Sequence, residues 1–177
     1  MNINLIIIIF VILTLNKSIF AESIAIVNIQ NLIDTNQIYI DVIEEMEINQ
    51  KLQLNVLEKK ENELIDVFNQ IENSKLILSE DELNVQISNY NNKLNNFSLL
   101  VDEFNYHYQN QIIVLRERVL NEIIMILENY AIQNKLDLIL DSTSYLIASN
   151  NLDITEIIYN KLAQVKFILQ YENFEKN

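Results

Sequence analysis

A stripe of apolar and aromatic residues at alternating steps of four and three constrains the fold of this chain more than any other feature. The stripe consists of Leu83, Ile87, Tyr90, Leu94, Phe97, Val101, Phe104 and Tyr108, and it continues through Ile112, Leu115, Val119, Ile123 and Ile126. Its mean spacing of about 3.5 residues is the coiled-coil repeat. Because so narrow an apolar seam is unfavourable in water, the sequence predicts a long helix packed against another helix.

The preceding residues predict the partner, a first long helix over 39–78. A period of seven runs through Ile43, Gln50, Leu57, Leu64, Ile71 and Leu78, and weaker apolar positions between them are Met46, Leu54, Val67 and Phe68. Ser79 and Glu82 then form a Ser-x-x-Glu capping box, which predicts the start of the second helix. Two such helices joined by a short turn predict an antiparallel hairpin about 60 Å long, at about 1.5 Å per residue.

The two ends of the chain predict a small body beside the hairpin. Residues 23–29 are short and rich in β-branched residues, which predicts a buried strand. Residues 136–140 and 145–148 predict a β-hairpin around a turn at 141–144, and Asp153 is positioned to cap a last helix that extends to about Tyr171. The remaining residues are polar, and we expect them to be frayed. The predicted fold class is α+β, mainly α.

The second helix changes character after Gln111. Apolar residues there cover more than one seam, at Ile112, Ile113, Leu115, Val119, Leu120, Ile123, Ile124, Ile126, Leu127 and Tyr130. A helix with two apolar faces has two packing partners, so this half of the helix is expected to contact the first helix and either the small sheet or another subunit.

Residues that are absent exclude several classes of enzyme. The chain has no Gly and no Cys, and its one histidine is His107. Phosphate-binding loops and nucleophile elbows need Gly, and thiolate catalysis and sulfur-based zinc sites need Cys. His107 is interpreted as a partly exposed helix residue. We therefore expect no enzyme, no catalytic residues, no cofactor and no metal site.

The formal net charge of −13 argues against polyanionic partners. An acidic chain repels the phosphates of nucleic acids and the headgroups of anionic membranes. Nucleic-acid binding is therefore not expected.

Residues 1–21 have the pattern of a secretory signal peptide. Residues 5–15 form an almost unbroken apolar run of h-region length, and Ala21 is a suitable residue before a cleavage site. The alternative is an uncleaved membrane anchor. Cleavage would leave residues 22–177 as a single domain in an exported compartment.

Three segments, taken in order around the hairpin, resemble the Skp/OmpH family of periplasmic chaperones: 23–29, 136–141 and 153–155. The resemblance covers about residues 23–166. It implies a homotrimer in which a body, here 22–38 and 112–177, carries hairpin tentacles, here 39–111 with the tip near 79–82.

The resemblance also implies a function. Members of the family are ATP-independent holdases that bind unfolded outer-membrane β-barrel proteins in the periplasm, within a cavity between coiled-coil tentacles. The alternative is a membrane-anchored structural coiled-coil tether of the cell envelope. This chain departs from the well-known, basic members in being acidic, which makes lipopolysaccharide binding unfavourable and places more weight on apolar contacts. It also extends about ten residues past Lys166, where the family usually ends.

A holdase needs exposed but dispersed apolar surface. The candidate client-binding residues lie off the seam, at Ile48, Leu52 and Val56 on the first helix and at Val85, Leu99, Leu100 and Tyr106 on the second. Each could instead be an ordinary surface residue or a contact within the trimer. The seam aromatics Tyr90, Phe97, Phe104 and Tyr108 are predicted to be core of the hairpin.

Overall fold

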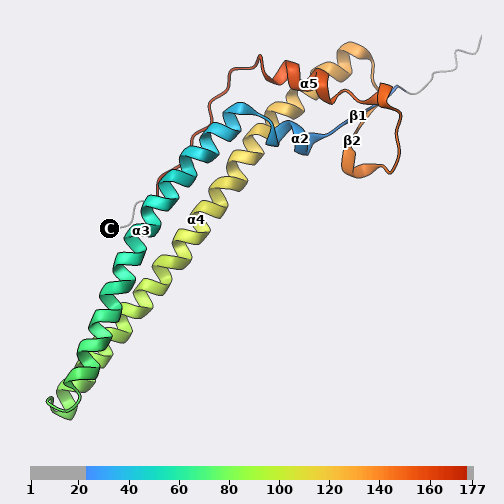
Figure 1. Cartoon of the computed structure of the whole chain (residues 1–177). Helices are drawn as coiled ribbons and strands as arrows, with labels where there is room; N and C mark the ends of the chain where they lie inside the picture. Colours follow the sequence, from blue (N-terminus) through green and yellow to red (C-terminus); the bar gives the residue numbers. More distant parts are fainter. Residues whose placement is uncertain (1–22, 175–177) are drawn as a thin grey trace, which may run out of the picture.

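A long helical hairpin projects from a small body in the computed structural model, which describes residues 23–174 (Figure 1). The arms are α3 (Gln37–Ser74) and α4 (Glu80–Asn134). With 55 residues, α4 is about 80 Å long at about 1.5 Å per residue, so it forms one arm and also passes through the body. The predicted α+β, mainly helical fold with a long antiparallel hairpin is confirmed.

The tip of the hairpin confirms the predicted capping box. The Ser79 side chain accepts a hydrogen bond from the Glu82 N–H at 3.4 Å, and the Glu82 carboxylate accepts one from the Ser79 N–H at 3.0 Å. The Ser79 hydroxyl and N–H together lower the pKa of Glu82. The box explains why the second helix begins here, since it gives unpaired N–H groups of the first turn an acceptor.

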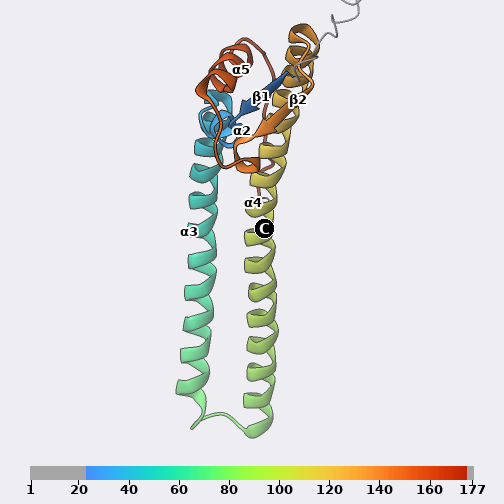
Figure 2. The same cartoon turned by 90° about the vertical axis from the view of Figure 1, so that its right-hand side faces the viewer.

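The predicted seam is most continuously buried near the body and less so toward the tip, where Ile71 is an isolated buried position. Buried seam residues are Met46, Leu57 and Ile71 on α3 and Phe104, Tyr108, Leu115, Val119 and Ile123 on α4. Nearer the tip, Ile87 and Leu94 are exposed. One of the weaker positions was wrong, because Leu54 is exposed and Gln53 is partly buried instead. Phe68 is also largely exposed, but its ring contacts Tyr90 of α4 with the ring centres 5.8 Å apart. Figure 2 shows α4 beside α3 over the length of α3 and continuing past it into the body.

The body contains a two-stranded parallel sheet. β1 (Ile24–Val27) pairs with β2 (Leu138–Asp141) in a register that aligns Ile24 with Leu138. The strands can run parallel because the entire hairpin lies between them in the sequence. The strand predicted over residues 23–29 and the first of the two later runs are therefore present.

The predicted β-hairpin with residues 145–148 is wrong. Asp141 accepts hydrogen bonds from the Thr143 N–H at 3.2 Å and the Thr143 hydroxyl at 2.5 Å, and the chain turns there into the short 3₁₀ helix Ser142–Ser144. That turn leads the chain away from β2. Residues 145–148 form no strand, and Leu146 and Ile147 are almost fully exposed.

Two short helices hold the sheet against the hairpin. α2 (Ile29–Asp34) and α5 (Thr155–Leu162) both contact α4, and Leu32, Ile33 and Ile158 are buried in the shared core. Arg116 of α4 forms an ion pair with Asp34 at 3.5 Å. A second 3₁₀ helix (Asn150–Leu152) precedes α5. Asp153 accepts a hydrogen bond from the Thr155 N–H at 2.8 Å, but the N-cap of α5 is Ile154, so the predicted position of the cap was one residue early.

The last helix is shorter than predicted. It ends at Leu162 instead of reaching Tyr171, and residues 165–174 have no regular secondary structure. From Val165 every second residue is apolar or aromatic and at least partly buried, through Phe167, Leu169 and Tyr171, which suits an extended chain better than a helix, although Ile168 between them is also apolar. Phe174 is buried, so the expectation of fraying is wrong for this residue.

The predicted signal peptide, residues 1–21, lies outside the described residues. Within 23–174, no helix combines the length and apolar character needed to cross a membrane.

Candidate functional site on the helical hairpin

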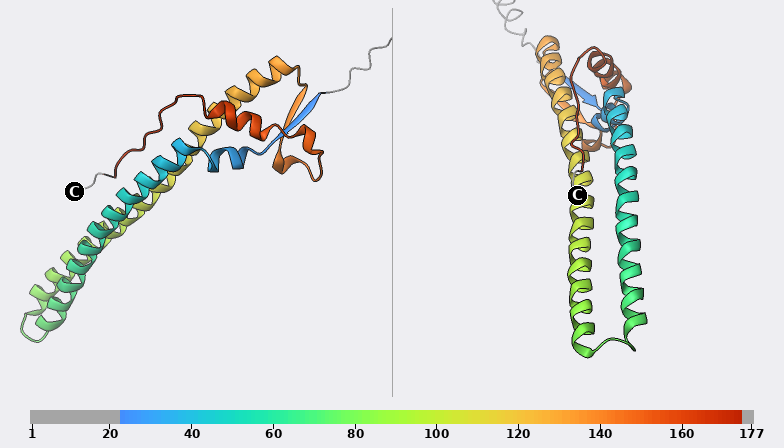
Figure 3. Two further views of the ribbon diagram at one scale, coloured as in Figure 1. Left: turned by 45° about the horizontal axis from the view of Figure 1, so that its top comes forward. Right: turned by 90° about the vertical axis from the view of Figure 1, so that its left-hand side faces the viewer.

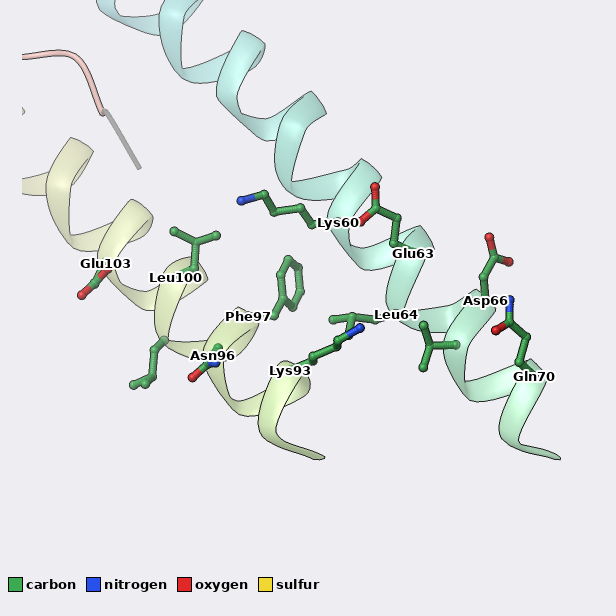
Figure 4. Close-up of a pocket in the computed structure, with 12 residues that line it drawn as sticks. Lys60, Glu63, Leu64, Asp66, Gln70, Lys93, Asn96, Phe97, Leu100 and Glu103 are labelled. Carbon is green, nitrogen blue, oxygen red and sulfur yellow. The ribbon is translucent and has the colours of Figure 1, made fainter. Parts of the chain in front are cut away.

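A groove of about 720 Å³ lies between the arms where the seam is loose (Figure 4). Phe97 and Leu64 extend into it from facing helices. Its lining consists of Lys60, Glu63, Leu64, Asp66, Val67, Gln70, Lys93, Asn96, Phe97, Leu99, Leu100 and Glu103. Lys60 occupies a seam position that an apolar residue would otherwise fill, so the two helices do not pack closely here.

The groove combines an apolar floor with charged side chains of both signs. This composition suits contact with apolar side chains of another chain, with polar groups at the rim. Within the described part of the chain, no group of three or more His, Cys, Asp or Glu residues is arranged to hold a metal ion.

The structure places most of the predicted client-binding residues at the surface. Six are exposed, namely Ile48, Leu52, Val56, Val85, Leu99 and Tyr106. The seventh, Leu100, is partly buried against the core. Leu99 and Leu100 both line the groove. A role in client binding stays a prediction for all seven.

The C-terminal tail, residues 163–174, forms a contact with the hairpin that the sequence did not predict. It leaves α5 and runs back along the hairpin (Figure 3). The Phe174 ring lies edge-on to Phe104, with the ring centres 5.5 Å apart, and also 5.5 Å from the His107 ring. The period-two pattern from Val165 to Tyr171 was the available signal for an extended tail.

Hydrogen bonds fix the backbone of the tail to α4. The Glu172 carbonyl lies 2.7 Å from His107 Nε2, so this nitrogen must carry the proton, because a carbonyl can only accept. The Glu172 N–H donates to the Gln111 side chain at 3.2 Å. On α3, the Glu45 carbonyl accepts a hydrogen bond from the Tyr171 hydroxyl at 3.4 Å. His107 is thus partly exposed, as predicted, but it also holds the tail.

Alkaline pH is expected to undock the tail. Burial and the nearby Glu45 carboxylate raise the pKa of Tyr171 above 10.0, and burial and Tyr171 raise the pKa of Tyr108. A raised pKa means that the folded state favours the neutral phenol. This stabilisation is complete below pH 10 and is lost as the pH rises through the folded pKa values. The melting temperature should therefore fall less steeply above pH 10 for Tyr171→Phe than for the unchanged protein. Equal slopes would contradict this prediction.

The body exposes a second apolar surface. Leu138 in β2 and Leu146 and Ile147 in the segment that follows it are exposed. Among the described residues, β2 pairs only with β1, so its other edge is open. An open strand edge beside exposed apolar side chains is a surface suited to pairing with another chain.

Comparison with known families identifies the relationship of this chain. The profile of the family described as Outer membrane protein (OmpH-like) matches residues 23–162, which is 140 of 177 residues. The chain belongs to the OmpH-like family. The match ends where α5 ends, so the docked tail lies beyond the part of the chain that matches this family.

A solved OmpH-like structure shares the fold. It is that of a candidate outer membrane chaperone (OmpH-like) from Caulobacter crescentus CB15, with a TM-score of 0.67 and 16% sequence identity. The alignment covers 88% of this chain and 92% of that one. No curated protein gives a significant match.

Proposed function

We propose that this OmpH-like protein is an ATP-independent holdase chaperone of the periplasm that binds unfolded outer-membrane β-barrel proteins. Family membership and the solved OmpH-like structure support a chaperone role. The observation that carries the proposal is the hairpin itself, which presents an open groove and dispersed, exposed apolar residues along slender arms. Such a surface can hold an unfolded chain without aggregating with itself, and the net charge of −13 adds solubility.

The proposal includes a homotrimer in which residues 22–38 and 112–177 form the body and residues 39–111 form the tentacles. The sheet has only two four-residue strands and leaves the edge of β2 open, so strands of neighbouring subunits could extend it. The open edge of β2 and the exposed Leu146 and Ile147 are the surfaces available for this. Clients would then bind in the cavity between three hairpins. No observation favours the envelope tether.

The test removes the exposed apolar residues of α3. Replacing Ile48, Leu52 and Val56 together by Ser should weaken client affinity about tenfold or more, because each side chain contributes roughly 1 kcal/mol through apolar burial. The measurement is suppression of aggregation of a diluted, unfolded β-barrel protein, with the mass of the chaperone in solution recorded in parallel.

A matched control replaces Leu54 and Ile65 by Ser. These residues are exposed on the other side of the α3 seam, so they test whether loss of any exposed apolar area has the same effect. The control should retain most of the protection. Unchanged protection by the triple variant would reject the assigned residues, and a monomer without any suppression would reject the holdase.

A further inference from the structure

The tail behaves as a bound extended peptide. Val165, Phe167, Leu169 and Tyr171 are partly or fully buried, whereas Lys166, Ile168, Gln170 and Glu172 between them are exposed. Alternate residues therefore face the protein, although the tail belongs to no sheet. Its backbone is held at Glu172 by side chains of α4 through both its N–H and its carbonyl. Backbone recognition combined with aromatic contacts is how proteins bind extended peptides of varied sequence.

The tail contacts and the open groove lie on one continuous face. On α4, the tail contacts Gln111, His107 and Phe104, and the groove residues Leu100, Phe97 and Lys93 continue the same steps of four and three. Such spacing keeps residues on one side of a helix. Figure 4 shows the described end of the tail above the open groove.

The α3 side of this face is also continuous. Glu45 contacts the tail, and Lys60 and Glu63 line the groove. Leu52 and Val56 lie between them and follow Glu45 at close to whole numbers of helical turns. Both are exposed. The tail therefore covers only the end of the face nearest the body and leaves the rest open.

Apart from Ile168, which is apolar and exposed, residues 165–172 alternate between apolar or aromatic and polar side chains, as the proposed client does. Apolar and aromatic residues that alternate with polar ones are the signature of a membrane-spanning β-strand. We propose that the face formed by Glu45–Gln70 and Lys93–Gln111 binds extended, alternating apolar and aromatic segments, and that the tail is its built-in competitor. This inference rests on the proposed function.

Tethering makes the tail an effective competitor. A segment linked by a short connection acts at a local concentration on the order of 1 mM. A free segment of similar affinity must displace the tail or bind only the open part of the groove. Release of the tail should therefore strengthen binding of such a segment.

The experiment uses full-length protein and two labelled peptides. One has the sequence of residues 165–177, and the other has the same composition with the alternation broken. The released variant is Leu169→Ser with Phe174→Ser, which removes two buried contacts. The control is Ile168→Ser with Gln170→Ser on the exposed side of the tail. Fluorescence anisotropy should show at least tenfold tighter binding of the first peptide by the released variant than by the control or the unchanged protein.

A second variant locks the tail in place. Because the chain has no cysteine, Gln111→Cys with Glu172→Cys can form only the intended disulfide within one chain. Oxidation should abolish binding of the first peptide, and reduction should restore it. Equal affinity in all variants, no peptide binding to the released variant, or tight binding of the peptide with broken alternation would each overturn the inference.

The two proposals fail differently. Tighter peptide binding on release, without suppression of β-barrel aggregation, would uphold the groove and reject the holdase. Suppression of aggregation that is the same with the tail locked or released would leave the holdase and reject the tail as its competitor.

Discussion

Leu115→Ala is expected to lower the free energy of unfolding by about 2–5 kcal/mol, the range for a buried leucine replaced by alanine. Leu115 is fully buried on α4 and belongs to the core shared by the hairpin and the body. The substitution leaves a cavity that rigid helices fill only in part. Urea denaturation should show a lower midpoint, with a slope close to that of the unchanged protein if the denatured state is unaffected.

Ile113→Ala provides the matched control two residues away. Ile113 is on the same helix but is 55% exposed, so its truncation creates no cavity. We expect a change of less than about 0.5 kcal/mol, as for other surface substitutions. A large loss at Ile113 would instead indicate that it is covered in an assembly, and a small loss at Leu115 would contradict the core described above.

Asp141→Ala is expected to destabilise the body by about 1.5–3 kcal/mol, the range for a hydrogen bond to a charged group. The Asp141 carboxylate accepts a hydrogen bond from the Ile29 N–H at 3.1 Å, which links the end of β2 to the start of α2. It also accepts the two bonds from Thr143 that turn the chain after β2. Asp141→Asn retains an acceptor oxygen, so its stability should lie between that of Asp141→Ala and that of the unchanged protein.

The effect of Asp141→Asn should depend on pH. Burial alone would raise the pKa of Asp141, but the Thr143 hydroxyl and the N–H groups of Ile29, Thr143 and Ser142 lower it below 3.8. With a lowered folded pKa, the stabilisation is present above the unfolded value and is lost as the pH falls through the folded one. The stability difference between Asp141→Asn and the unchanged protein should therefore shrink below pH 3.8. A constant difference would show that the charge is unimportant.

Features set by local pattern were predictable from the sequence. The seam from Phe104 to Ile123, the capping box at Ser79 and the strand beginning at Ile24 all depend on neighbours within a turn or two. The groove was not predicted, because its volume depends on how Lys60 and Phe97 meet across two helices. The exposure of Leu52 and Val56 followed from their positions off the seam.

The wrong predictions concern segments whose local sequence fits two different structures. Residues 145–148 have strand composition, but the hydrogen bonds of Asp141 turn the chain before they can pair with β2. Residues 165–171 are compatible with a helix and with an extended chain. Contacts of Glu172 and Phe174 with α4 favour the extended chain. Such choices depend on distant residues, which no local pattern contains.

The parallel pairing of β1 with β2 has a consequence for the order of folding that we expect. Ile24 and Leu138 are neighbours in the sheet although 114 positions separate them. Closing so long a flexible loop would be slow and entropically unfavourable. The hairpin removes this obstacle, because its helices form through short-range contacts and turn the chain back at Ser79. We expect α3 and α4 to pack against each other first and so to bring β2 next to β1. The body is then the last part of the subunit to become ordered.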